Sequence, residues 1–299
     1  MKGKKNFIKR TTLEGYCFVL PALIFMVALI AYPLIYNVIL SFRNLDVRTF
    51  KGDTSVFVGL QNYRELFASS TFSLVLKNTF TFTVFSLIFQ FTIGFALAIF
   101  FYKKFKLAAP IRGLLLIVYM MPMSVTALLC RNMFMVNGGV INDILLKLSI
   151  VSEPIEWLIS TSTALPTIIM ANCWVGIPFN MLLLTTGLSS ISEEIYESAK
   201  VDGANSIQRF FYMTLPLLKS SILSVLMLGF IYTFKAFDLI FVMTGGGPLN
   251  STDVLGTYAY SLSFGQYQFS MGAAAAVILF ICLFIIGLCY LKLTMSEED

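Results

Sequence analysis

Long, nearly uncharged stretches alternate with short polar segments along most of this chain. Six such stretches stand out, at about residues 16–42, 78–102, 113–134, 164–188, 220–244 and 271–291. A helix needs roughly 20 apolar residues to cross the hydrocarbon core of a bilayer, and each stretch reaches that length. The pattern predicts an all-α polytopic membrane protein with six transmembrane helices, in which residues 1–299 form a single transmembrane domain.

The composition agrees with a membrane protein and removes most classes of enzyme. Hydrophobic residues make up 58% of the chain and charged residues only 12%, whereas about a quarter of a soluble domain is charged. The absence of histidine excludes histidine-based metal sites and catalytic dyads, and the cysteines lack metal or redox spacing. The glycine-rich segment Thr244–Pro248 lacks the lysine and hydroxyl residue of a phosphate-binding loop. We therefore expect a non-catalytic protein without a cofactor, in which any ATP hydrolysis belongs to another chain.

Lysine and arginine are distributed unevenly between the two sides of the predicted spans. With the N-terminus in the cytoplasm, thirteen fall in inside segments, six in outside loops, and two, Arg131 and Lys235, within or near spans. Cytoplasmic loops carry the excess of positive charge, so both termini are predicted to be cytoplasmic. The basic N-terminal run is expected to meet anionic membrane lipid rather than nucleic acid.

The cytoplasmic segment at about residues 189–219 contains the signals of two short helices. Ser190–Glu193 is a capping-box pattern that starts a helix, and apolar residues then recur at every fourth position over 191–199. Gly203 can take the left-handed conformation that ends a helix, and Asn205–Ser206 begins a second one. The acidic first helix favours docking to a protein over the alternative, an amphipathic loop lying on anionic lipid.

The same segment resembles the EAA loop of the membrane subunits of ABC importers. Glu197-Ser198-Ala199, then Gly203, then Met213-Thr214-Leu215-Pro216 follow the family pattern, with Ser198 and Met213 as small departures. In the family this loop is the coupling helix, which fits into a cleft on the ATP-binding subunit. The resemblance implies that the following residues serve ATPase coupling: Glu197, Ala199, Asp202 and Gly203.

Further segments resemble the sugar-importer permeases of the maltose and glycerol-phosphate type. They are residues 58–67 (VGLQNYRELF), 78–84 (NTFTFTV), 172–181 (NCWVGIPFNM), 237–260 (FDLIFVMTGGGPLNSTDVLGTYAY) and 272–277 (GAAAAV). The resemblance implies the type I ABC importer permease fold and a location in a prokaryotic inner membrane. It implies a sugar as substrate, and the favoured candidate is an oligosaccharide. It also implies the partners: a second homologous permease subunit, two ATP-binding subunits and an extracytoplasmic sugar-binding protein.

Polar residues inside the predicted spans are the candidates for a substrate site, because polar groups are costly in hydrocarbon. In the fourth span Asn172, Gly176, Phe179 and Asn180 lie close to one helical face. Pro178 removes a backbone hydrogen bond, a change that can open a helix. The pattern fits a sugar site, in which aromatic rings stack on the sugar, and it fits a kinked packing helix equally well.

Resemblance to the maltose-type permease assigns sugar-lining positions in three spans. They are Tyr119, Asn172, Val175, Gly176, Phe179 and Thr233. Met123, Gly229 and Ala236 stand where that relative has polar side chains. We therefore expect a different sugar, held in a different pose.

Lys235 and Asp238, three residues apart in the fifth span, allow two interpretations. They can pair on one helical face, which we favour because a paired charge costs less in a membrane than a lone one. Alternatively they bind a charged sugar, such as a uronate or a sugar phosphate.

Two other classes of protein stay open: a sensory or scaffold protein, and a secondary sugar transporter. The latter predicts two similar halves and embedded carboxylates, whereas Asp238 is the only acid deep in a span.

Overall fold

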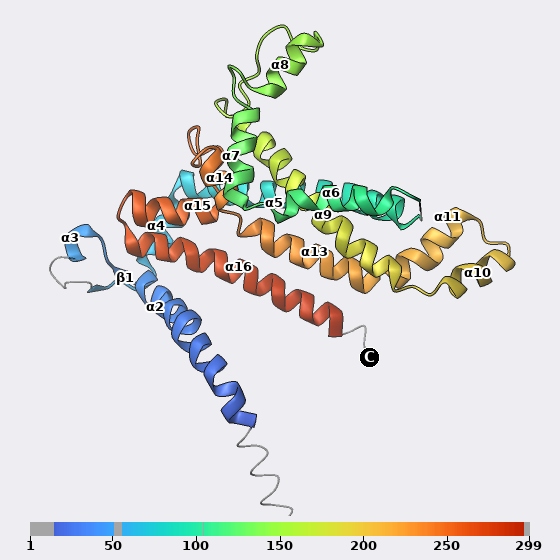
Figure 1. Cartoon of the computed structure of the whole chain (residues 1–299). Helices are drawn as coiled ribbons and strands as arrows, with labels where there is room; N and C mark the ends of the chain where they lie inside the picture. The colour runs from blue at the N-terminus through green and yellow to red at the C-terminus, as the bar shows by residue number, and fades with distance from the viewer. Residues whose placement is uncertain (1–14, 51–55, 104, 296–299) are drawn as a thin grey trace, which may run out of the picture. The chain divides into compact units, whose positions relative to one another are not determined.

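The computed structural model describes residues 15–50, 56–103 and 105–295, mostly as helices. Its packing separates two compact units, which are described in turn. The first unit comprises the described residues up to Leu66 together with Ala259–Val277, and the second comprises Phe67–Tyr258 together with the described residues from Ile278. Figure 1 shows the elements in chain order.

The first unit consists of one long apolar helix followed by a small polar cap. The helix, Gly15–Ser41, includes a π-helical turn at Val27–Ala31 and ends as α2 (Tyr32–Ser41). It is followed by β1 (Arg43–Asn44), α3 (Val47–Phe50), β2 (Val56–Phe57) and α4 (Gln61–Ala68), with β1 and β2 antiparallel. From the later part of the chain this unit contains the end of α15 (Leu255–Tyr260), a π-helical turn at Ser261–Gly265, and the start of α16 (Phe269–Met295), whose residues from Ile278 onward belong to the second unit.

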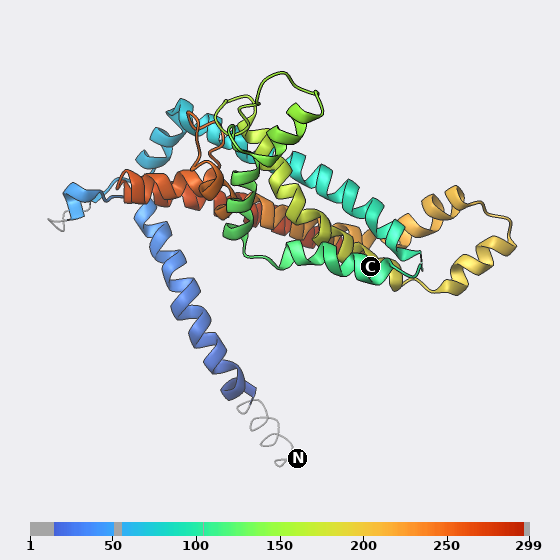
Figure 2. The same cartoon turned by 45° about the horizontal axis from the view of Figure 1, so that its top comes forward.

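The second unit is built on two long helices, α5 (Ser70–Tyr102) and α9 (Ala164–Ser189). Around them lie α6 (Ala108–Met120), α7 (Met123–Met133), α8 (Val140–Lys147), α13 (Lys219–Phe234) and α14 (Asp238–Met243). Between α9 and α13 the chain forms α10 (Glu193–Val201), α11 (Ser206–Arg209), a π-helical turn at Phe210–Thr214, and α12 (Leu215–Leu217). Figures 1 and 2 show α10 and α11 projecting beyond the ends of α9 and α13.

Close packing of α5 against α9 organises the second unit, and it depends on two glycines. A Cβ at Gly94 would lie 2.6 Å from the Cβ of Asn180 and 3.2 Å from the carbonyl oxygen of Ile177. A Cβ at Gly176 would clash with the side-chain amide of Gln90. Small residues allow membrane helices to approach closely and gain van der Waals contact. The two glycines therefore set how near α5 and α9 lie to each other.

Among the described residues, four helices are long and apolar enough to cross a membrane, and the total is six if each of two bent pairs is one span. The four are Gly15–Ser41, Ser70–Tyr102, Ala164–Ser189 and Phe269–Thr294, and the pairs are Ala108–Met120 with Met123–Met133 and Ser206–Leu217 with Lys219–Phe234. The first pair bends by 97°, although the sequence pattern predicts one continuous span at about residues 113–134. The reason is Pro122, which disfavours a helical conformation at Met121 (φ −71°, ψ 141°).

The fourth and fifth spans also differ from the sequence expectation. α9 continues through Pro178 as an uninterrupted helix, so this proline does not open it. The predicted fifth span, in contrast, stops at Phe234 and resumes as α14 only at Asp238. The interruption therefore lies in the fifth span, and its residues line the cavity described next.

Candidate functional site

A cavity of about 320 Å³ lies in the second unit, between α9 and the interrupted end of α13. All six residues expected to line a sugar site surround it: Tyr119, Asn172, Val175, Gly176, Phe179 and Thr233. Gln90 from α5 and Met123 from α7 close one side, and residues 235–239 close another. Parts of α5, α6, α7, α9 and α13, together with residues 235–239, thus converge on one space.

Aromatic rings form one wall of this cavity. Tyr119 and Phe179 stack with ring centroids 5.2 Å apart and planes at 24°. Tyr232 meets Phe179 edge-on, at 5.9 Å and 88°. Trp174, the other aromatic candidate of the fourth span, is 61% exposed and lies outside the cavity on an apolar surface groove. Ring stacking within the cavity is therefore available from Phe179 and its two neighbours, and not from Trp174.

Buried polar groups supply the hydrogen-bonding capacity of the cavity. The backbone oxygen of Asn172 accepts a bond of 3.1 Å from Nε2 of Gln90. The side-chain nitrogen of Asn172 is buried but has no hydrogen-bond partner among the described residues. Buried polar groups are almost always paired, so the side-chain NH2 group of Asn172 is an unusual unsatisfied donor. It is available to donate a hydrogen bond into the cavity that Asn172 lines.

Asn180 does not belong to the cavity, although it shares the predicted face of α9. Its side chain is 1% exposed, faces Gly94 of α5, and donates a 2.8 Å hydrogen bond to the carbonyl oxygen of Gly176. Asn180 is therefore a packing residue. The packing interpretation of the fourth span therefore holds for Asn180, whereas the sugar site stays a prediction for the residues of α9 that line the cavity.

Lys235 and Asp238 line the cavity as separate charges. Within the described part of the chain no ion pair joins them, so the structural pair favoured from their spacing is not formed. The spacing argument needs a continuous helix, whereas α13 ends at Phe234 and α14 begins at Asp238. The ammonium of Lys235 instead lies 5.2 Å from the ring centroid of Tyr232, within the range of a cation–π interaction.

The glycine-rich loop after α14 is tied to α5. The side-chain nitrogen of Asn78 donates to the carbonyl oxygens of Asn250 (3.0 Å) and Asp253 (3.2 Å), and the hydroxyl of Thr79 accepts from the Leu255 amide at 2.9 Å. Gly246 has φ +90°, and a Cβ there would clash with the Asp253 carboxylate. Burial raises the pKa of Asp253, a shift that the hydrogen bond from Thr257 opposes. The segment that sequence resemblance marks is thus a tightly held loop.

The predicted coupling segment forms the expected helix, turn and helix. The hydroxyl of Ser192 caps α10 by accepting from the Glu194 amide at 3.3 Å, so the helix starts two residues later than a Ser190 cap predicts. Ser190 instead donates to the carbonyl oxygen of Gly187. Gly203 has φ +81°, and Asn205 and Gln208 form a reciprocal capping box on α11.

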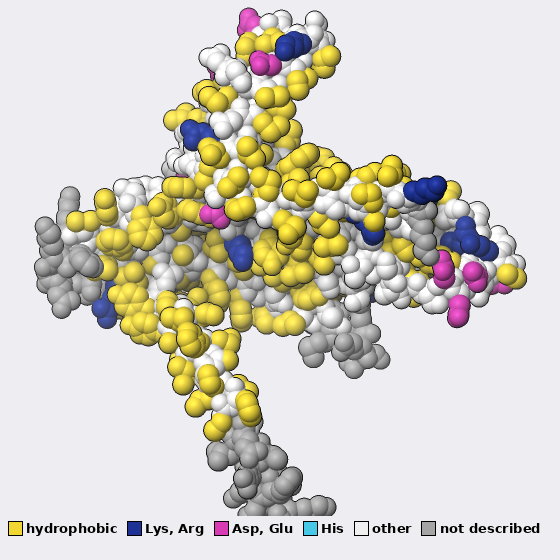
Figure 3. Space-filling model, viewed as in Figure 1, with side chains coloured by type: hydrophobic (Ala, Val, Ile, Leu, Met, Phe, Trp, Pro, Cys, Tyr) yellow, Lys and Arg dark blue, Asp and Glu magenta, His cyan; other side chains and the backbone are white. Residues whose placement is uncertain are grey.

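The four residues assigned to coupling divide into a surface group and a supporting residue. Glu197, Asp202 and Gly203 are exposed, whereas Ala199 is 1% exposed and packs inward. Tyr196 joins α10 to the π-helical turn at Phe210–Thr214 through a 3.0 Å hydrogen bond with Thr214. Charged side chains gather over α10 and α11 (Figure 3). The segment therefore presents a shaped, charged surface.

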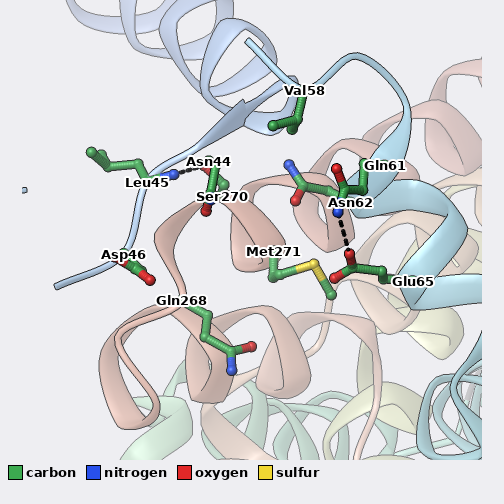
Figure 4. Close-up of a pocket in the computed structure, with 10 residues that line it drawn as sticks. All are labelled: Asn44, Leu45, Asp46, Val58, Gln61, Asn62, Glu65, Gln268, Ser270 and Met271. Carbon is green, nitrogen blue, oxygen red and sulfur yellow. Dashed lines mark hydrogen bonds between the residues drawn. The ribbon is translucent and has the colours of Figure 1, made fainter. Parts of the chain in front are cut away.

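The first unit contains a separate polar pocket of about 240 Å³ (Figure 4). Its wall is held together by hydrogen bonds from the Leu45 amide to the Ser270 hydroxyl (2.9 Å) and from Gln61 to Glu65 (2.9 Å). Asn62 donates to the carbonyl oxygens of Ser41 and Arg43, both at 2.8 Å. These bonds give residues 58–67 a structural role that sequence resemblance alone does not explain.

The helices and their apolar spans define a polytopic α-helical membrane protein. Residues 90–292 match the family described as binding-protein-dependent transport system inner membrane component, and the chain belongs to this family. The sulfoquinovosyl glycerol transport system permease protein SmoG of Agrobacterium fabrum is 33% identical over 278 residues, 93% of this chain and 89% of that protein. The trehalose/maltose transport system permease protein MalF of Thermococcus litoralis is 31% identical over 286 residues, 95% of each chain.

A solved structure shows the same fold over the whole chain. One chain of a bacterial ABC transporter involved in the import of the acidic polysaccharide alginate superposes with a TM-score of 0.84, at 23% identity and with 100% of both chains covered. The predicted all-α type I importer permease fold is thereby confirmed.

Proposed function

We propose that this chain is one of two permease subunits of an ATP-driven importer that carries a sugar into the cell. An oligosaccharide is the favoured candidate substrate. The observation that carries the proposal is the cavity in which Tyr119, Asn172, Phe179 and Thr233 meet. Stacked rings and an unpaired amide suit a polyhydroxylated ring, which has an apolar face and many hydrogen-bonding groups. The names of the two relatives refer to sugar-containing substrates.

The assembly follows from the same proposal. A second homologous permease subunit completes the pathway, an extracytoplasmic binding protein delivers the sugar, and two ATP-binding subunits hydrolyse ATP while this chain catalyses no reaction. Both termini lie in the cytoplasm, which places α10 and α11 on the side of the ATP-binding subunits. Glu197, Asp202 and Gly203 form the contact surface, and Ala199 anchors it to the permease.

α9 connects the two functional regions mechanically. One face of α9 lines the cavity with Asn172, Gly176 and Phe179, and the helix ends at Ser189, close before the Ser192 cap of α10. Because the helix is uninterrupted, a push on α10 by closing ATP-binding subunits reaches the cavity wall. Closure opens the cavity to the outside and admits the sugar, and ATP hydrolysis restores the inward-facing state.

Transport measurements test the proposal directly. Phe179→Ala removes the ring that contacts both Tyr119 and Tyr232, so uptake of the cognate sugar per assembled complex should fall. Trp174→Ala, on the same helix but outside the cavity, is the matched control and should keep near-normal uptake. Equal uptake by both variants, or a loss confined to Trp174→Ala, contradicts the assignment. Uptake without any ATP-binding subunit would instead support a secondary transporter.

A charged sugar is the second candidate substrate, favoured by one observation. Lys235 and Asp238 both face the cavity and are not paired with each other. A lone charge at membrane depth commonly serves substrate binding, and the Lys235 ammonium can hold a carboxylate or phosphate. Lys235→Gln should then abolish uptake of an anionic sugar while sparing a neutral one of similar size. Unchanged discrimination between the two sugars would remove this candidate.

A further inference from the structure

A second pocket, of about 420 Å³, lies at the base of α10 and α11, away from the cavity. Its walls come from the end of α5, the end of α9, one side of α10, and α11 with the turn that follows. α5 ends at Tyr102 and α9 at Ser189, so the pocket lies where two membrane spans end. That level is the boundary between hydrocarbon and head groups.

The pocket carries an excess of positive charge. Lys103, Lys200 and Arg209 line it from three different segments, and Glu193 is the one acidic residue among the described lining residues. Three cations and one carboxylate leave a net charge of +2. Within the described residues, the ammonium groups of Lys103 and Lys200 have no hydrogen bond or ion pair. The Arg209 guanidinium donates one bond, of 3.2 Å, to Ser206.

Apolar groups line the same pocket beside these charges. Ile99, Leu188 and Phe210 contribute to its wall, and Phe210 also contacts Phe95 on α5 with ring centroids 5.9 Å apart. Phe100, one position beyond Ile99, is 54% exposed on the surface of α5. A pocket with both basic and apolar walls suits a molecule with an anionic head and an acyl chain, whereas a free anion would contact only the basic part.

The pocket and the coupling surface use different sides of α10. Glu193, Tyr196 and Lys200 line the pocket at spacings of three and four residues, one side of a helix. Glu197 is exposed, does not line the pocket, and belongs to the proposed contact surface for the ATP-binding subunit. Both ligands can therefore be bound at once, with α10 between them.

We propose that this pocket binds the phosphate of an anionic phospholipid such as phosphatidylglycerol, and that the bound lipid braces α10 against the span ends. The proposal rests on the membrane orientation and coupling role given above. Basic pockets between helices at the cytoplasmic surface are the usual sites for such head groups. A braced α10 transmits the movement of the ATP-binding subunits to α9 instead of bending under it.

Native mass spectrometry of the full complex, purified with added phosphatidylglycerol, measures the proposed binding. The double variant Lys200→Gln/Arg209→Gln should retain at least tenfold less of this lipid, since each basic residue at a membrane surface contributes about fivefold. Lys103→Gln, which lies beyond the end of α5, should lose about fivefold. Lys292→Gln, near the end of α16 and outside the pocket, is the control and should bind as the unaltered chain does.

A functional measurement distinguishes lipid from the other anions. ATPase activity in phosphatidylcholine vesicles should rise as phosphatidylglycerol is added, for the unaltered complex and for Lys292→Gln, and much less for the double variant. Equal lipid retention by the double variant and the control overturns the proposal, and so does displacement of the lipid by inorganic phosphate. Loss of the ATP-binding subunit with lipid retained assigns the pocket to that subunit instead. Lipid retention does not depend on sugar uptake, so failure of the proposed function is seen separately.

Discussion

α9 and the α10–α11 segment adjoin in the chain but are held in place in opposite ways. Over half of the residues of α9 are buried, among them Asn172, Asn180 and Leu184, and they contact residues far away in the sequence. In α10 only Ala199 is buried, and in α11 no residue is. There the Ser192 cap, the Asn205 capping box and the left-handed Gly203 act on near neighbours.

Substitutions in these two regions should therefore affect different properties of the protein. A substitution in α9 alters the packing against α5 and therefore the cavity, whereas a substitution on α10 alters a surface without disturbing the packed helices. If the comparison holds, defects in assembly, coupling and sugar affinity should be separable.

Gly94→Val should have the largest effect on stability, because it disrupts the close contact between α5 and α9. The added Cβ meets Asn180 and the Ile177 backbone, which cannot move as a flexible side chain can. Overpacking of this kind costs about 1–3 kcal/mol or more, so the thermal unfolding midpoint and the yield of assembled complex should fall. Gly113→Val, at a glycine with nothing within 4 Å, is the control. Equal unfolding midpoints for the two variants would show that α5 and α9 do not depend on this close approach.

Gly203→Val should reduce coupling while leaving the permease folded. Its φ of +81° costs a β-branched residue on the order of 1–3 kcal/mol, which should lower sugar-stimulated ATPase activity at least about fivefold. Gly203→Asn is the control, because asparagine tolerates the left-handed conformation. Glu197→Lys should weaken retention of the ATP-binding subunit in the same preparation. Full stimulated activity in both Gly203→Val and Glu197→Lys would remove α10 from the coupling surface.

Asn172→Ala should change sugar affinity and little else. Losing one hydrogen bond costs about 0.5–1.5 kcal/mol, so half-maximal uptake should need roughly two- to tenfold more sugar. Basal ATPase activity and assembly should stay near normal, because the lost side-chain nitrogen has no partner in the described structure. Uptake curves normalised to assembled complex provide the measurement. An unaltered curve would place the sugar elsewhere.

The smallest expected effect is the interaction between Lys235→Met and Asp238→Leu. Their effects on the free energy of unfolding should simply add in the double variant. Sequence spacing predicts that the double variant rescues the single ones, but the two side chains form no ion pair. Changes at sites that do not interact add within about 0.3–0.5 kcal/mol. Thermal unfolding of the two single variants and the double variant forms the cycle. A clear rescue by the double variant would mean that the pair forms after all.

Features that depend on near neighbours could be predicted from the sequence alone. The apolar stretches locate the membrane-crossing helices, since twenty apolar residues favour hydrocarbon in any context. Gly203 and Asn205 end and start helices as expected, because each acts on residues three or four positions away. The six residues named by family resemblance also meet in one cavity.

How these parts pack against one another depends on contacts between distant segments, which the sequence pattern does not reveal. The tertiary structure keeps α9 continuous through Pro178 and interrupts the fifth span before Asp238. It turns Asn180 toward Gly94 and separates Lys235 from Asp238. Hydropathy and caps act over a few residues, whereas these outcomes depend on which distant surfaces pack together. In this protein that packing is chiefly α5 against α9, where two glycines allow the helices to meet and leave a cavity beside them.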